Sequence, residues 1–436
     1  MKRLLSEMQF LPALYIHIPF CRSKCGYCDF YSLAGQEPEV KRKILQRTFE
    51  QIDFFLEQIC PDTVGTVYIG GGTPNSLEPE TFTDLLERTA ALCGRTAVTE
   101  WTVELNPECI TSAQLSELRE AGVSRISVGA QSFSGPLLRF IGRNASADET
   151  LSAIELVSDT WKGSWNIDLI TAVPGQTDES ALEDLRRAVA FGPDHISFYG
   201  LTVEPGTPLA EREESGGFIR KSDEESAAAL KRGWDMLRAA GYSHYEVSNF
   251  ARPGCFSRHN LHYWRMHPYL GAGPGAVSTL PAAHGNLPLR LSVSRNFEEF
   301  LNRSFFPGTG PGTLNRVSDT TRKALEAEIL SESEFLLEYL MMGLRTIPGI
   351  ELKEFRRIFG TDIRNVIPLT IEKALGEDLL TIDTAEGGEG SEYLSPTETG
   401  MLLLDSILLQ AAVEAEKCSV ELKWPPHETL LKYRQS

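Results

Sequence analysis

The sequence has no long hydrophobic run and no excess of positive charge. No stretch approaches the roughly 18 apolar residues that a membrane-spanning helix needs, and the leucine-rich run from Met401 to Leu409 is interrupted by Asp405. The 436 residues carry 42 Lys and Arg against 60 Asp and Glu, a formal net charge of −18. A field of this sign repels nucleic-acid phosphates. These absences argue against an integral membrane protein and against nucleic acid as a partner.

A recognisable export signal is also missing. Glu7 and Gln9 interrupt the apolar residues that follow Lys2 and Arg3, and no small-residue cleavage site comes after them. Only eight cysteines occur, and three of them are clustered. In a reducing compartment such a cluster binds metal more often than it forms disulfides. We therefore expect a cytoplasmic protein with a metal or iron–sulfur site.

Short β-branched or aromatic segments alternate with helical patterns over the first half of the chain. This alternation is typical of βα units around a parallel sheet. The clearest helical pattern extends from Val40 to Cys60. Six such units favour a partial (β/α)6 barrel over a doubly wound sheet, although periodicity alone leaves both open. The six expected strands are Leu14–Ile18, Thr66–Ile69, Thr99–Leu105, Ser124–Val128, Asn166–Ile170 and His195–Gly200.

The regular alternation ends after Ser278, and Pro307–Gly312 has the composition of a linker. We expect the barrel in residues 1–290, a linker in 291–330 and a smaller, mostly helical domain in 331–436. Helical patterns surround one hairpin in the last range, which resembles a winged-helix module. Its excess of acidic residues argues against DNA reading. We expect it to pack on the barrel or to contact a protein.

Three cysteines, Cys21, Cys25 and Cys28, form a C-x3-C-x2-C motif directly after the first expected strand. Three thiolates on one loop can hold three irons of a [4Fe–4S] cluster and leave the fourth iron open to another ligand. A zinc site completed by a nearby histidine such as His17 is the alternative, but zinc sites usually use paired C-x2-C units. The same spacing is the signature of the radical S-adenosylmethionine (SAM) superfamily, which the chain resembles at this motif.

Glycine-rich or polar segments accompany the later expected strands. The Gly70–Pro74 turn follows the second strand, Glu104 ends the third, Gln131 follows the fourth, and Asp168 lies in the fifth. Taken alone, the glycine turn is as typical of a simple tight turn as of a binding turn, and each of the three polar residues is more typical of a solvated strand end. Because active sites of parallel barrels gather where the strands end, together they predict a ring of polar groups around one mouth.

Five segments carry a closer resemblance: Tyr15–Phe30, Gly70–Pro74, Gly129–Phe133, Asp168–Thr177 and Tyr245–Asn249. They are similar to the oxygen-independent coproporphyrinogen dehydrogenase group and to the related radical SAM haem chaperones of the HemW type. The dehydrogenases have a further cysteine where this chain has Phe30, and a longer extension than the 20 residues that precede Cys21. Both differences favour the chaperones.

A second segment, His259-Asn260-Leu261-His262-Tyr263-Trp264, is similar to the HN-x-x-YW haem-binding signature of the chaperones. Imidazole is a common axial haem ligand, and aromatic rings offer flat apolar surface to a porphyrin. The spacing leaves His262 and His267 open as ligands, while the resemblance points to His259. Without the resemblance, the segment reads as an aromatic loop that closes the barrel mouth.

The resemblance implies a role for each matching residue. Cys21, Cys25 and Cys28 would ligate the cluster, and His259 would bind haem. Ala145, two residues after the pair Gly142-Arg143, stands where relatives usually have a histidine, which puts proton transfer to a porphyrinogen in doubt. The SAM site would be formed by Tyr15, Tyr27, Gly72, Thr73, Glu104, Gln131, Arg143, Asp168, Gly200 and Val277.

We therefore expect a haem chaperone with a [4Fe–4S] cluster, SAM and haem, which passes haem to an acceptor protein such as a respiratory enzyme. The alternative is an oxygen-independent coproporphyrinogen III dehydrogenase, in which a radical derived from SAM would attack propionate side chains. A radical SAM enzyme that modifies tRNA is a third hypothesis, which the net charge disfavours. The sequence leaves open whether the protein is an enzyme and which oligomeric state it adopts.

Overall fold

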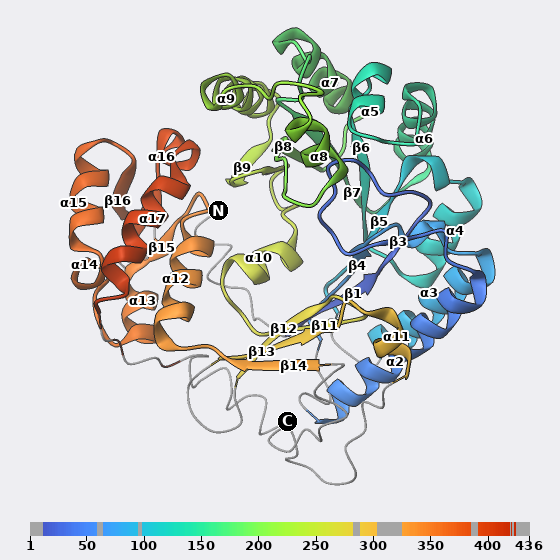
Figure 1. The fold of residues 1–436 in the computed structure, drawn as a ribbon, viewed down its shortest axis with the longest axis horizontal. Coiled ribbons are helices and arrows are strands. Elements are labelled where there is room, and N and C mark those ends of the chain that lie inside the picture. The colour runs from blue at the N-terminus through green and yellow to red at the C-terminus, as the bar shows by residue number, and fades with distance from the viewer. Residues whose placement is uncertain are drawn as a thin grey trace.

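The computed structural model describes residues 12–58, 64–94, 98–281, 288–302, 325–384, 391–418, 420 and 423. In this part of the chain a twelve-stranded sheet forms a large body, and a smaller helical module lies beside it (Figure 1). The strand order is β14-β13-β12-β11-β1-β4-β5-β6-β7-β8-β10-β9. Its middle holds six consecutive parallel strands, which confirms the predicted barrel class.

Each predicted strand of the barrel is present, with ends shifted by a few residues. These strands are β1 (Ala13–Ile18), β4 (Thr66–Gly71), β5 (Glu100–Leu105), β6 (Arg125–Gln131), β7 (Ser164–Thr171) and β8 (His195–Gly200). The segments between and after them form α2 (Pro38–Gln58), α3 (Pro79–Gly94), α4 (Ser112–Ala121), α5 (Gly135–Phe140), α6 (Ala147–Thr160), α7 (Asp178–Ala190), α8 (Pro208–Glu214) and α9 (Asp223–Ala239). Short elements follow three of these strands in the chain: β2 (Phe20–Cys21) and β3 (Leu33–Ala34) after β1, η1 (Pro74–Ser76) after β4, and η2 (Pro107–Cys109) after β5.

The barrel strands alternate apolar side chains, which face the helices, with polar side chains, which face the interior. On β6, Ile126 and Val128 are buried in the main hydrophobic core, whereas Arg125, Ser127 and Gln131 line an interior cavity. Strand β7 repeats this pattern. Successive side chains of a strand point to opposite faces, so one sequence pattern builds both the core and a polar interior.

The sheet continues beyond the barrel on both sides. β10 (Asn249–Ala251) pairs antiparallel with β8, and β9 (Ser243–Glu246) pairs antiparallel with β10. On the other side, β11 (Tyr269–Ala272) runs parallel to β1. β12 (Val277–Pro281), β13 (Pro288–Val293) and β14 (Leu325–Ile329) add an antiparallel meander.

The described part of the expected linker 291–330 holds the end of β13, the helix α11 (Phe297–Asn302) and β14. The sheet therefore extends past residue 290. Pro307–Gly312 lies outside the described residues, and the division into three ranges stays a prediction.

The C-terminal module has its own hydrophobic core, which includes Phe335, Phe355 and Leu394. One small antiparallel sheet, of order β15-β17-β16, lies among helices, as the sequence predicts. The elements are α12 (Glu332–Gly343), β15 (Ile350–Glu351), α13 (Leu352–Phe359), α14 (Ile363–Val366), α15 (Pro368–Gly376), β16 (Leu380–Thr384), β17 (Glu392–Pro396), α16 (Glu398–Leu402) and α17 (Leu404–Ala415).

The barrel and the module meet at the end of β9, where Glu246 is fully buried. Glu246 pairs with Thr346 in an isolated antiparallel bridge, and the Val247 amide donates to the carbonyl of Arg345 at 2.9 Å. The Glu246 carboxylate accepts one hydrogen bond from the Ser248 amide at 3.0 Å, while its Oε1 has no partner among the described residues. Burial raises the pKa of Glu246 to about 7. The junction thus encloses a carboxyl group that ionises near neutral pH.

Replacing Glu246 by Gln should remove a pH dependence of stability. Above about pH 4.5 the unfolded chain ionises this group, whereas the folded chain keeps it protonated up to about pH 7. Stability is therefore lost as pH rises through this window, by an amount on the order of 3 kcal/mol. Urea unfolding at pH 5 and pH 8 should show that the wild type loses stability relative to Glu246→Gln. Parallel pH profiles for the two proteins would contradict this assignment.

Candidate cluster and cofactor site

A cavity of about 510 Å³ extends along the barrel interior from the ends of the parallel strands. Most of the predicted site residues line it, which brings together the ring of polar groups that the sequence predicts. These residues are Cys21, Cys25, Tyr27, Cys28, Gly72, Thr73, Glu104, Gln131, Arg143, Asp168 and Gly200. The sequence reasoning missed further polar residues that share the lining: Tyr68, Asn106, Arg125, Ser127, Asn166, Ser197, Tyr199 and Asn260.

The three cysteines lie on the loop that follows β1, and two of the thiols have polar neighbours. The Thr73 hydroxyl donates to the Cys21 sulfur at 3.6 Å, and the Arg143 guanidinium donates to the Cys25 sulfur at 3.7 Å. Burial raises the pKa of Cys21 and of Cys28. A positively charged iron centre would reverse that shift, because it stabilises the thiolate form.

The glycine turn after β4 is shaped around the carboxyl group of Glu104. The Tyr68 hydroxyl donates to Glu104 at 2.6 Å and the Gly71 amide donates at 3.0 Å. A Cβ atom at Gly70 would lie 2.5 Å from this carboxyl group, so a larger residue would displace it. Burial raises the pKa of Glu104. The turn and the carboxyl group therefore form one unit at the cavity wall.

Asp168 on β7 is held in the cavity by its neighbours inside the barrel. It accepts hydrogen bonds from the Ser127 hydroxyl at 3.1 Å and from the Asn166 amide at 2.8 Å. Asn166 Oδ1 in turn lies 2.6 Å from a ring nitrogen of the buried His195. Burial raises the pKa of Asp168. A ligand hydroxyl or ammonium group would find an oriented acceptor here.

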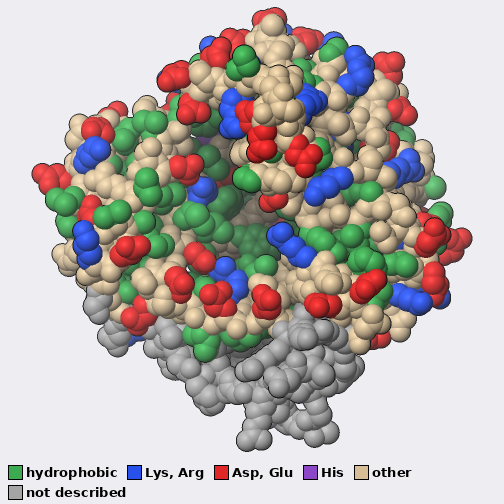
Figure 2. All heavy atoms as spheres, viewed as in Figure 1, with side chains coloured by type: hydrophobic (Ala, Val, Ile, Leu, Met, Phe, Trp, Pro, Cys, Tyr) green, Lys and Arg blue, Asp and Glu red, His purple; other side chains and the backbone are tan. Residues whose placement is uncertain are grey.

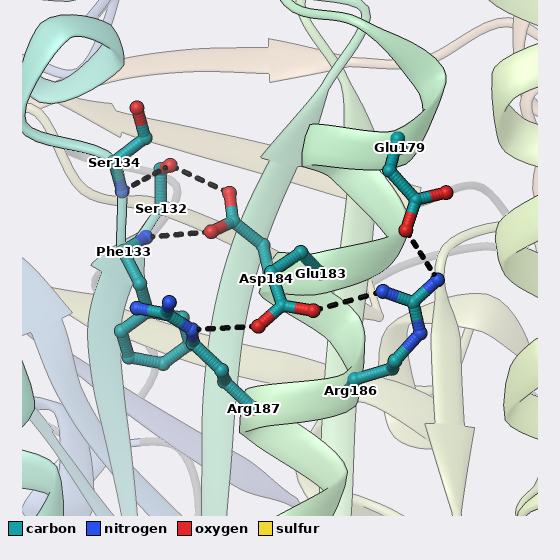
Figure 3. Close-up of polar contacts among 8 residues, drawn as sticks. All are labelled: Ser132, Phe133, Ser134, Glu179, Glu183, Asp184, Arg186 and Arg187. Atoms are coloured by element: carbon teal, nitrogen blue, oxygen red, sulfur yellow. Dashed lines mark hydrogen bonds and ion pairs between the residues drawn. The ribbon is translucent and has the colours of Figure 1, made fainter.

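Gln131 has a left-handed backbone conformation, with φ of 66°, which a non-glycine residue rarely adopts. The next residues are tied to Asp184 on α7, as Figure 3 shows: Asp184 accepts from the Ser132 hydroxyl at 2.6 Å and from the Phe133 amide at 3.0 Å. Asp184 does not line the cavity, so we expect it to act on Gln131 through the Ser132–Phe133 segment. It lies on the buried face of an amphipathic helix, and an acidic residue at such a position is the signal that could have revealed it.

The predicted haem ligand His259 lies on α10 (Arg258–Trp264) and is fully buried. Its Nδ1 is 2.9 Å from the Thr66 hydroxyl, and its Nε2 is 2.8 Å from the Tyr263 hydroxyl. Glu100 accepts hydrogen bonds from the backbone amides of Arg258 and His259 at 2.9 Å. Thr66 and Glu100 are the first residues of β4 and β5, so α10 lies at the opposite end of the barrel from the cysteines. The segment therefore does not close the cysteine-lined mouth.

Two predicted SAM residues and the predicted zinc ligand lie outside the cavity lining. The Tyr15 hydroxyl is 2.9 Å from His17 Nδ1, and His17 Nε2 is 2.9 Å from the carbonyl of Tyr31. Both ring nitrogens of His17 are thus already engaged. Val277 begins β12. The roles of Tyr15 and Val277 in SAM binding stay predictions.

Comparison with known proteins gives two matching family models. The radical SAM superfamily matches residues 15–188, and the HemN C-terminal domain matches residues 330–403. An Escherichia coli protein named "Heme chaperone HemW" is 32% identical over 91% of this chain and 97% of its own length. The chain belongs to the HemW family. A second relative, "Radical S-adenosyl methionine domain-containing protein 1, mitochondrial" of Danio rerio, is 31% identical over 93% of this chain and 87% of its own.

The HemW family shares its fold with coproporphyrinogen III oxidase (HemN) of Escherichia coli. That solved structure matches with a TM-score of 0.69 over 94% of this chain and 92% of its own, at 19% identity. This likeness confirms the fold. No helix in the described ranges is long and apolar enough to cross a membrane.

As a member of the radical SAM superfamily, the HemW family uses a [4Fe–4S] cluster and SAM. Cys21, Cys25 and Cys28 fit the cluster, since they share one loop and one cavity wall. No three His, Cys, Asp or Glu side chains of the described chain are arranged to enclose a single metal ion. In a cluster each thiolate binds a separate iron, so this donor set suits a cluster better than zinc. A cluster held by these cysteines would supply redox chemistry, and the cavity residues would hold SAM beside it.

Replacing Asp184 by Ala should weaken SAM binding about tenfold or more, because Gln131 loses the support of the Ser132–Phe133 segment. Asp184→Asn can still accept from the Phe133 amide and hydrogen bond to Ser132, so it should keep most of the affinity. Equilibrium dialysis with SAM on the reconstituted protein measures the effect, and the cluster absorbance should stay unchanged.

Glu183→Gln is the matched control, since Glu183 is the neighbouring residue of α7 and bonds only surface arginines in Figure 3. Equal SAM affinity in Asp184→Ala and Glu183→Gln would show that the Ser132–Phe133 segment does not position Gln131.

Proposed function

We propose that this chain is a haem chaperone, which binds haem at α10 and passes it to an acceptor protein. Membership of the HemW family supports the proposal, because several relatives are named as haem chaperones. The observation that carries it is the state of His259, a buried, neutral imidazole whose Nε2 has a tyrosine hydroxyl as its one hydrogen-bond partner among the described residues.

His259 has the properties of an imidazole that can ligate iron. Burial lowers its pKa well below the ordinary value, so the ring is neutral at pH 7 and keeps a lone pair for a metal. In the tautomer that donates from Nδ1 to Thr66, the Nε2 lone pair accepts from Tyr263. Metal-bound histidines usually donate from their other nitrogen in this way. Rotation of the Tyr263 side chain would then expose Nε2 to the haem iron.

The porphyrin would lie outside the barrel cavity. A volume of about 510 Å³ is of the size that one small ligand fills. In this proposal SAM occupies that volume, so the porphyrin lies elsewhere. Figure 2 shows a hollow between the C-terminal module and the barrel, where hydrophobic side chains gather. In the same view of Figure 1, α10 lies at this position. Tyr263 and Trp264 of α10, both partly exposed, offer aromatic surface to a porphyrin.

The acceptor in this proposal is a haem protein such as a respiratory enzyme, and the compartment is the cytoplasm. Free thiols support the second point, since the three cluster cysteines need a reducing environment to stay available for iron.

A coproporphyrinogen III dehydrogenase is the second candidate, favoured by the near full-length fold match to HemN. One residue argues against this candidate. Phe30, which lines the cavity and has 66% of its surface exposed, stands at the position where the dehydrogenases have a cysteine. Anaerobic incubation with SAM, a reductant and coproporphyrinogen III tests this alternative. Formation of protoporphyrinogen IX would make the protein an enzyme of haem synthesis.

His259→Ala should lower haem affinity tenfold or more without changing the cluster absorbance, because it removes the axial ligand. Added imidazole should restore part of the Soret band, which a merely structural loss would not allow. Tyr263→Phe should bind haem at least as tightly as the wild type, since the competing hydroxyl is gone. Titration of the reconstituted proteins with haem measures all three effects.

The matched control is His262→Ala, which removes a second buried imidazole of α10 whose Nε2 lies 2.7 Å from the Pro268 carbonyl. This variant should retain haem. If His259→Ala binds haem as the wild type does, or if His262→Ala alone loses it, His259 is not the ligand.

A further inference from the structure

The inner row of β4 reaches from the proposed haem ligand to the cavity wall. Thr66, Tyr68 and Gly70 lie on one face of this strand, because alternate residues of a strand share a face. The Thr66 hydroxyl is 2.9 Å from His259 Nδ1, and a Cβ atom at Gly70 would lie 2.5 Å from the Glu104 carboxyl group. Tyr68 lies between these two positions. It is therefore placed where the predicted SAM wall meets the predicted haem ligand.

Tyr68 contacts a functional group at each end of that row. Its hydroxyl donates to Glu104 Oε1 at 2.6 Å. Its ring lies against the imidazole of His259, with the ring centroids 5.1 Å apart and 31° between the ring planes. Burial and the charge of Glu104 raise the pKa of Tyr68 well above its usual range, so the hydroxyl keeps its proton and remains the donor. One side chain thus joins a cavity carboxyl group to a buried imidazole.

Both partners of Tyr68 are also held from their other sides. Glu104 accepts a second hydrogen bond from the Gly71 amide at 3.0 Å, and His259 Nε2 is 2.8 Å from the Tyr263 hydroxyl. Packed interiors are nearly incompressible and transmit small displacements. A change at the Glu104 carboxyl group would therefore reorient the Tyr68 ring against His259 instead of being absorbed locally.

We propose that Tyr68 is a positioning residue, which couples occupancy of the cavity at Glu104 to the orientation of His259. SAM carries an ammonium and a sulfonium group, and a cation beside Glu104 stabilises its charged form. A charged carboxylate holds a hydroxyl donor more strongly than a neutral carboxyl group does, so the Tyr68 ring is fixed more firmly when SAM is present. His259 then has one orientation before haem arrives, which lowers the entropy cost of ligation.

The effect on haem rests on the proposed function and is a coupling between two ligands. SAM should tighten haem binding about fivefold or more, and haem should tighten SAM binding by the same factor. Tyr68→Phe keeps the ring beside His259 but loses the bond to Glu104, so the ratio of haem affinities with and without SAM should fall to about one. A merely structural loss would weaken both affinities equally and leave this ratio unchanged. Haem titration of the reconstituted full chain, with and without saturating SAM and without a reductant, measures the ratio.

Tyr269→Phe is the matched control. Tyr269 belongs to the same group of aromatic side chains, where its ring packs edge-on against Tyr263 with centroids 4.6 Å apart. It does not line the cavity. This variant also loses one tyrosine hydroxyl near His259, and it should keep the wild-type ratio.

A measurement without haem separates this proposal from the haem-binding one. In protein with isotopically labelled histidine, the NMR signals of the His259 ring are identified by their loss in His259→Ala. They should shift when SAM is added to the wild type and to Tyr269→Phe, but not in Tyr68→Phe. A wild type in which SAM changes neither these signals nor the haem affinity, or a Tyr68→Phe variant that responds as the wild type does, would overturn the proposal. If haem does not bind but the shift depends on Tyr68, the proposed function fails and the coupling stands.

Discussion

The polar interior of the barrel is the constraint on which the rest of the structure depends. Each strand places one row of side chains against the helices and the other row in the cavity, so a shift of one residue would turn charges into the core. The strand positions of Glu104, Asp168 and Arg125 therefore fix how far along the cavity each of these groups lies. The hydrogen bonds of Glu104 and Asp168 lower the cost of their burial, and those bonds also hold the two carboxyl groups in one orientation.

Buried carboxylates that accept backbone amides recur wherever a loop must keep its shape. Glu104 holds the glycine turn, Asp184 holds the segment after Gln131, and Glu100 holds the start of α10. A charged acceptor bonds an amide more strongly than a neutral one. Such a bond fixes the backbone without placing a side chain in the cavity. Asp184 and Glu100 shape the surroundings of the cavity without lining it, whereas Glu104 does both.

The barrel and its cysteine motif could be predicted because their signals are local. Strand and helix periods extend over many residues, and the spacing of Cys21, Cys25 and Cys28 identifies an iron–sulfur site within one loop. Arg125 and Asp184 could not be found in the same way. An arginine at the start of a strand and an aspartate in a helix look like surface residues until the fold turns them inward.

The sheet beyond residue 278 was harder to predict for a related reason. The strands β12 to β14 pair antiparallel at the sheet edge. The sequence there shows no regular alternation of strand and helix patterns that would indicate them. The position of α10 depends on contacts between distant parts of the chain, from Thr66 and Glu100 to His259. Spacing within the segment carries no information about such contacts.

The placement of α10 at the end of the barrel opposite the cysteines has a consequence for electron flow. A haem bound at His259 and a cluster at Cys21 would be separated by about the length of a strand, roughly 20 Å. Electron exchange between metal centres falls steeply with distance through protein. With both centres bound in this way, the barrel would separate two iron centres of different redox character and slow electron exchange between them.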